Sequence, residues 1–192
     1  DIDEFYRLYC DHLRNHGQLN LTEKSTTIGP MRIDLDFKYA GKLDDHLHTQ
    51  DQVVNFMKAY MTEVKKFLIV PESVEIFVSE KPEPTYYSAD PAKNKPDYSK
   101  SGIHVVIPDL KTNHFVEEEI RRVLLKRMPE FFPELPLSDK WEKVYDPSPL
   151  THTSNWTLLG SRKKEGTPYQ IKYILDWDPE TNEMSIDDNV PT

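Results

Sequence analysis

The 192-residue chain has only one cysteine, Cys10. A lone cysteine excludes an intramolecular disulfide, and it excludes zinc modules that need several cysteine ligands. The sequence therefore fits a reducing compartment.

Long hydrophobic runs are also lacking. No apolar stretch approaches the roughly 20 residues that span a bilayer, and no signal peptide is visible. Hydrophobic residues still make up 37% of the chain, which is enough to build a globular core. The sequence predicts one globular domain that does not contact a membrane.

Basic residues are fewer than acidic ones. The chain has 24 lysines and arginines and 33 aspartates and glutamates, which gives a net charge of −9. This balance argues against broad electrostatic binding of nucleic acid. It does not exclude an enzyme that acts on nucleic acid, since bound metal ions and a local basic patch can reverse the field at a site.

Hydrophobic periodicity predicts an α+β fold. Helical spacing marks three segments, two of which begin at capping residues: 3–13, a helix from the Thr49/Gln52 capping box to Leu68, and a helix after Thr112 or Asn113. Strand patterns mark a short strand within 19–28, then 31–39, 74–78, 103–107 ending at Pro108, and a hairpin of 156–160 with 169–177. We expect a loop at 81–99, an irregular connector at 129–136 and a tail after Asp178.

The stretch 31–39 carries the first candidate site. Ile33, Leu35 and Phe37 alternate with polar residues, so Asp34 and Asp36 point together to the other face of the strand. Their Cα atoms lie about 6.5 Å apart along a strand, and both carboxylates can reach shared Mg²⁺ or Mn²⁺ ions. The alternative is an exposed acidic face on an edge strand.

Two further segments carry charged groups of the same chemistry. One is 100–104, in which His104 opens a strand and Gly102 permits close approach of a ligand. The other runs from Asp146 to a basic cluster at 161–163. A core histidine and a charged loop tip remain the alternatives for these two segments.

Other polar clusters have plainer interpretations. We interpret the acid- and histidine-rich segment 41–48 as a solvated loop, although it could suggest a metal site. The basic residues near 121–127 follow a run of glutamates, which favours helix stabilisation over a DNA-binding patch. The second Asp-x-Asp, Asp176 and Asp178, is interpreted as a strand that ends in a turn.

In order and spacing, these motifs resemble the archaeo-eukaryotic primase superfamily, and more closely the primase part of primase–helicases from large DNA viruses of the poxvirus and asfarvirus type. The middle motif is Gly102-Ile103-His104 with an apolar strand and Pro108. The last is Val144-Tyr145-Asp146, followed by the run from Asn155 to Lys163. The resemblance covers roughly 32–173, and it implies an RRM-like catalytic sheet packed with helices plus a second α/β part.

The resemblance also implies roles for individual residues. Asp34, Asp36 and Asp146 would be the catalytic carboxylates that bind Mg²⁺ or Mn²⁺. The residues that would bind the nucleotide are Lys100, Gly102, His104, Ser161, Arg162 and Lys163. Two departures stand out, because Gly102 replaces a serine found in many members and Thr157 replaces an arginine found in some.

The activity implied is primer synthesis on single-stranded DNA from nucleoside triphosphates, by a catalytic domain at 1–178 with an acidic tail or linker at 179–192. It would act inside the cell, at the viral replication site in the host cytoplasm. A helicase region of the same polypeptide would lie outside this chain, since no Gly-x-x-x-x-Gly-Lys-Ser/Thr motif is present. The alternatives are a metal-dependent nuclease, a non-templated nucleotidyltransferase, or a non-catalytic nucleic-acid-binding domain.

Overall fold

A computed structural model describes residues 1–15, 17–151, 154–162, 166–188 and 190. The helices are α1 (Ile2–Arg14), α2 (Gln50–Val64), α3 (His114–Leu125), α4 (Met128–Phe131) and α5 (Trp141–Val144), with short 3₁₀ turns at Pro91–Lys93 and Ser148–Leu150. The strands are β1 (Thr22–Lys24), β2 (Gly29–Ala40), β3 (Val74–Glu80), β4 (Thr85–Tyr87), β5 (Tyr98–Thr112), β6 (Asn155–Thr157), β7 (Gln170–Trp177) and β8 (Met184–Asp187). The predicted α+β class is confirmed.

Six of these strands form one antiparallel sheet in the order β2-β5-β3-β7-β8, with β4 on the free edge of part of β5. The order β2-α2-β3-β5-α3 along the chain follows the start of a β-α-β-β-α-β unit. The sixth position is taken by 137–145, which meets the outer edge of β2 through the bridges Tyr39–Leu137 and Leu35–Tyr145. This is the RRM-like sheet that the resemblance implied.

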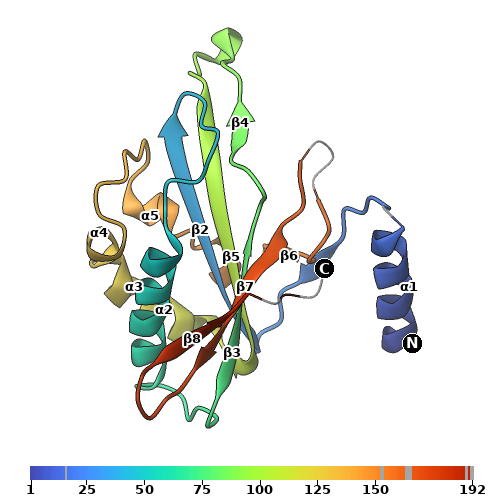
Figure 1. The fold of residues 1–192 in the computed structure, drawn as a ribbon, viewed down its shortest axis with the longest axis vertical. Coiled ribbons are helices and arrows are strands. Elements are labelled where there is room, and N and C mark those ends of the chain that lie inside the picture. The colour runs from blue at the N-terminus through green and yellow to red at the C-terminus, as the bar shows by residue number, and fades with distance from the viewer. Residues whose placement is uncertain (16, 152–153, 163–165, 189, 191–192) are drawn as a thin grey trace.

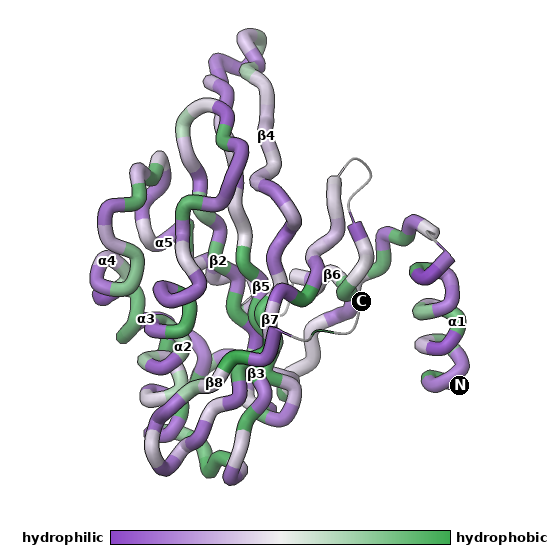
Figure 2. The backbone as a smooth tube through the Cα atoms, viewed as in Figure 1, coloured by the Kyte–Doolittle hydropathy of each residue, from purple (hydrophilic) through white to green (hydrophobic). Residues whose placement is uncertain are grey.

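Helices α2 and α3 lie together on one side of the sheet (Figure 1). The alternation in β2 explains this, because Ile33, Leu35 and Phe37 are at most 1% exposed and lie within the core. Hydrophobic segments gather where the sheet meets these helices, whereas the projecting end of β4 and β5 is mainly hydrophilic (Figure 2). The opposite face of the sheet is therefore left to polar side chains. Within the described part of the chain, no helix is both long and apolar enough to cross a membrane.

Three sequence predictions placed the ends of helices or strands wrongly. Strand β5 does not end at Pro108 but continues to Thr112, because Pro108 lies in a bulge between the pairs Met31–Ile107 and Pro30–Lys111. A bulged residue needs no ladder N–H, and proline has none. The predicted loop 81–99 contains β4 and the start of β5, and the predicted connector 129–136 overlaps α4.

The predicted hairpin of 156–160 with 169–177 is also wrong. Strand β6 pairs with β1 in a separate two-stranded sheet, whereas β7 pairs with β3 and β8. The predicted tail after Asp178 contains β8, which extends the main sheet. The turn at Asp178 is as predicted, since its carboxylate accepts hydrogen bonds from the backbone N–H groups of Glu180 and Thr181 at 2.7 and 3.3 Å.

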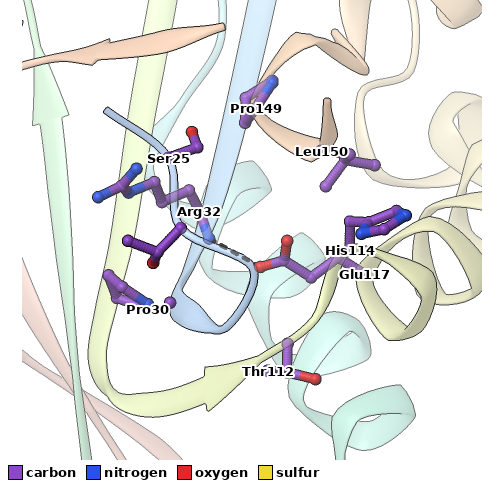
Figure 3. A pocket seen from close by; sticks show the side chains of 10 residues that line it. Ser25, Pro30, Arg32, Thr112, His114, Glu117, Pro149 and Leu150 are labelled. Atoms are coloured by element: carbon purple, nitrogen blue, oxygen red, sulfur yellow. Dashed lines mark hydrogen bonds between the residues drawn. The ribbon is translucent and has the colours of Figure 1, made fainter. Parts of the chain in front are cut away.

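A buried carboxylate joins α3 to the start of β2. Glu117 is 8% exposed and accepts a hydrogen bond from the backbone N–H of Arg32 at 3.2 Å (Figure 3). Burial raises the pKa of Glu117 from 4.5 to about 7, against the opposing effects of the Arg32 hydrogen bond and charge. The folded state therefore holds the Glu117 proton more tightly than the unfolded chain does.

Glu117 should make stability depend on pH. Its contribution is fully present below pH 4.5 and is lost as the pH rises through about 7. The intact chain should lose about 3 kcal/mol of unfolding free energy from this group between acidic pH and about pH 8. Glu117→Gln should not show this loss, because glutamine does not titrate. Urea unfolding across this range measures the difference, with Glu118→Gln on the exposed side of α3 as the control. Parallel curves for Glu117→Gln and the intact chain would contradict it.

Candidate active site

Asp34 and Asp36 lie on the face of β2 that points away from the core. Across the strand pair, Asp34 faces His104 of β5 and Asp36 faces Gly102. Directly opposed residues point to the same side of a sheet, so the two sequence motifs form one surface. Neither aspartate is more than partly buried.

Asp146 reaches the same surface from the end of α5. The bridge between Tyr145 and Leu35 turns the Tyr145 ring into the core and leaves Asp146 on the other side. The Asp146 backbone N–H donates to the Asp34 carbonyl at 3.0 Å. Arg121 of α3 fixes this turn, because its guanidinium donates to the Tyr145 carbonyl from Nε at 2.9 Å and from Nη2 at 2.6 Å.

The three aspartates bring one carboxylate oxygen each to within 4.8 Å of one another. A set made only of carboxylate oxygens suits hard divalent cations such as Mg²⁺ or Mn²⁺. The ammonium group of Lys100 contacts this cluster, with its Nζ 2.5 Å from Asp36 Oδ2. Desolvation lowers the Lys100 pKa, but the charge of Asp36 and its hydrogen bond outweigh that effect and leave the pKa raised. The residues present fit a site for divalent metal.

His104 lies beside the carboxylates between two aromatic rings. Its ring stacks on Tyr169 at a centroid distance of 3.6 Å and packs at 4.5 Å against Trp156 on β6. His104 Nε2 lies 3.7 Å from Asp34 Oδ1. The Arg32 guanidinium covers Trp156 at 5.6 Å. Histidine orientation at the site thus depends on rings from two distant segments.

These groups line a cleft of about 720 Å³ between the main sheet and the β1–β6 sheet. The walls add cationic and hydroxyl groups to the acidic floor. Its lining includes Asp34, Asp36, Lys81, Lys100, Gly102, His104, Asp146, Trp156, Ser161, Arg162 and Tyr169. Eight of the nine predicted site residues therefore meet at one cleft, and the ninth, Lys163, lies outside the described residues.

Ser161 has a different environment from the one that a phosphate donor needs. It is 1% exposed, and its Oγ accepts from the Leu21 N–H at 3.1 Å and lies 3.0 Å from the Tyr9 hydroxyl of α1. The neighbouring Gly160, at φ +80°, packs against Leu13 of the same helix. Ser161 thus ties α1 and the approach to β1 to the wall of the cleft.

Ser161→Ala should therefore affect stability more than nucleotide use. It leaves the partly buried Leu21 N–H without its acceptor, which should cost about 1 kcal/mol of unfolding free energy. Thermal or urea unfolding measures the loss, and Ser88→Ala at an exposed position is the control. An unchanged unfolding curve with a raised nucleotide KM would instead make Ser161 a phosphate ligand.

The segment 41–48, interpreted as a solvated loop, is partly buried on the other face of the sheet. His46, His48 and Glu80 bring possible metal-ligand atoms within 4.8 Å of one another. His46, however, uses both ring nitrogens within the protein: Nε2 donates to the Lys81 carbonyl at 2.9 Å and Nδ1 accepts from Ser101 Oγ at 2.5 Å. Ser101 lies between Lys100 and Gly102, so His46 supports the cleft from behind.

A β-α-β-β-α-β sheet whose polar face carries three clustered carboxylates beside basic side chains agrees with an archaeo-eukaryotic primase domain. Residues 1–175 match the family described as the C962R protein N-terminal AEP domain, where AEP denotes archaeo-eukaryotic primase, and the chain belongs to this family. It is also 28% identical over 176 residues to L207/L206 of Acanthamoeba polyphaga mimivirus, a protein named as a helicase. The match covers 90% of this chain but only 17% of that relative's length.

Proposed function

We propose that this domain synthesises primers on single-stranded DNA by template-directed nucleotide transfer during viral DNA replication. The observation that carries the proposal is the carboxylate triad of Asp34, Asp36 and Asp146 at the floor of a cleft lined by Lys100, His104 and Arg162. Acidic groups for cations and basic groups for phosphates lie side by side there, as nucleotidyl transfer requires.

In the proposed reaction, the 3′-hydroxyl oxygen attacks the α-phosphorus of the incoming nucleoside triphosphate. The bond from the α-phosphorus to the bridging oxygen breaks, pyrophosphate leaves, and the hydroxyl proton passes to solvent. Two bound divalent cations would supply activation of the hydroxyl and compensation of the phosphate charge. The three aspartates would hold those cations, and each aspartate comes from a segment fixed by backbone pairing.

The basic groups orient the triphosphate. His104 stacks on Tyr169 and packs against the tilted ring of Trp156, with its Nε2 toward Asp34. Lys100 can exchange its contact with Asp36 for a phosphate oxygen once a cation occupies the carboxylates. Arg162 lies on the wall carried by the turn after β6, and Lys163 follows it.

We also propose the partners of this domain. They are a single-stranded DNA template, nucleoside triphosphates, and a helicase region in the same polypeptide, which the helicase name of the much longer mimivirus relative supports. We place the reaction at the viral replication site in the host cytoplasm. Because 184–187 form β8, a linker toward the helicase region would begin only after this strand.

Template dependence tests the proposal. A labelled primer on templates that differ in one base should be extended only by the complementary nucleotide, with Mg²⁺ or Mn²⁺ present. Shortening of the primer would indicate a nuclease, and extension that ignores the template would indicate a non-templated transferase. No reaction and no binding of Mn²⁺ or nucleotide by folded protein would indicate a non-catalytic binding domain.

A further inference from the structure

Gly102 leaves a gap beside Asp36 that a residue from far along the chain fills. A Cβ atom built on Gly102 would lie 2.3 Å from the Tyr169 hydroxyl oxygen and 3.3 Å from Asp36 Oδ1. The Tyr169 hydroxyl therefore occupies the place where a side chain at position 102 would begin, next to a carboxylate of the triad.

Two neighbouring side chains contact the Tyr169 ring. His104 stacks on it at 3.6 Å with the ring planes only 13° apart, and Lys81 Nζ lies 5.6 Å from the ring centroid. Lys100 and Arg162 line the same cleft. The cleft that Tyr169 lines thus holds basic groups suited to an anion. The Tyr169 ring cannot move without displacing His104.

The hydroxyl keeps its proton. The ordinary pKa of a tyrosine hydroxyl is about 10, so the group is neutral near pH 7. A phenol that stays neutral can donate a hydrogen bond without adding negative charge to the acidic floor.

We propose that the Tyr169 hydroxyl donates a hydrogen bond to the triphosphate of the incoming nucleotide, in the space that Gly102 leaves open. This inference rests on the proposed nucleotide-transfer function and adds a binding residue to it. Tyr169 then serves the site twice, with its ring fixing His104 and its hydroxyl contacting phosphate.

Tyr169→Phe separates these two roles, because it removes the hydroxyl and keeps the stacked ring. The KM for the nucleotide in primer extension should rise by about tenfold or more, the range for a lost hydrogen bond to a charged group. kcat and Mn²⁺ binding should change much less. Tyr173→Phe is the matched control, since Tyr173 lies four residues further along, in β7, with its hydroxyl buried in the core.

A swap between the two positions tests the location of the hydroxyl. Gly102→Ser alone places its Cβ against Tyr169 and should raise the nucleotide KM by displacing the ring. In the double variant Gly102→Ser/Tyr169→Phe the clash with the hydroxyl is gone, and serine returns a donor to the same space. The double variant should therefore have a lower nucleotide KM than either single variant.

Three results would overturn the inference. The first is an unchanged KM in Tyr169→Phe, and the second is a double variant no better than Tyr169→Phe. The third is an equal loss of Mn²⁺ binding, which would mean that the hydroxyl supports the carboxylates rather than the nucleotide. None of these results contradicts the proposed function, because primer extension by the unaltered chain tests that function in the same assay. If the unaltered chain neither extends primers nor binds labelled nucleotide, both proposals are wrong.

Discussion

Asp34→Asn should reduce nucleotide addition by at least about a thousandfold. Asparagine keeps the shape of the side chain but removes one negative charge from the triad, and metal-ion stabilisation of several kcal/mol corresponds to three or more powers of ten in rate. Primer-extension rates measure the loss, and Mn²⁺ titration should show weaker binding. Asp109→Asn, at an exposed position in the bulge of β5, is the control.

The same variant should fold at least as well as the unaltered chain. Three carboxylates with oxygens within 4.8 Å repel one another, so removal of one charge relieves the folded state. A variant that is folded and equally stable but inactive places the defect in the site. Activity within a few-fold of the unaltered chain would contradict the assignment of Asp34 as a metal ligand.

Lys100→Met should have the second largest effect, and it should move two measurements in opposite directions. In the unaltered chain, Mn²⁺ must compete with the Lys100 ammonium group for Asp36. The methionine variant lacks this competitor, so the affinity of the site for Mn²⁺ should rise. Loss of a charged phosphate donor should lower kcat/KM for the nucleotide by about 10- to 100-fold. Manganese titration and steady-state primer extension measure the two effects.

Lys95→Met is the matched control for Lys100, because Lys95 is exposed on the projecting hairpin and lies away from the carboxylates. It should leave metal affinity and nucleotide use nearly unchanged. Weaker Mn²⁺ binding in Lys100→Met would mean that the lysine holds the carboxylates in place for the metal. That result would contradict the proposal that Lys100 leaves Asp36 for a phosphate oxygen when metal binds.

The sequence predicted those parts of the site that depend on local patterns. Alternation within one strand is enough to separate Asp34 and Asp36 from the core residues between them. The cap at Asn113 and the capping box at Thr49 likewise depend only on neighbours along the chain, and the structure confirms both. Asp146 was found through a motif, since nothing local predicts the bridge from Tyr145 to β2.

The sequence missed the residues whose position depends on pairing between distant segments. In a regular strand over 169–177, Tyr169 and Ile171 would share a face with Tyr173. A bulge at Lys172, between the pairs Val78–Tyr173 and Ser79–Ile171, reverses the alternation and turns Tyr169 toward His104. One extra residue in a strand moves all side chains beyond it to the opposite face.

The position of Trp156 was missed for a related reason. The strand predicted at 156–160 was expected to pair with 169–177, but β6 pairs with β1, which places Trp156 over His104. Ser161 then meets α1, a helix 150 residues earlier in the chain, and its hydroxyl is used within the fold. Strand alternation carries no information about which partner a short strand will choose.

The most direct test of the central claim is primer synthesis on unprimed single-stranded DNA, with nucleoside triphosphates and Mg²⁺ or Mn²⁺. The unaltered chain is compared with the double variant Asp34→Asn/Asp36→Asn at equal concentrations of folded protein. The account predicts short products complementary to the template from the unaltered chain and none from the variant. Equal products from both proteins would contradict the carboxylate site, and products that ignore the template sequence would contradict templated synthesis.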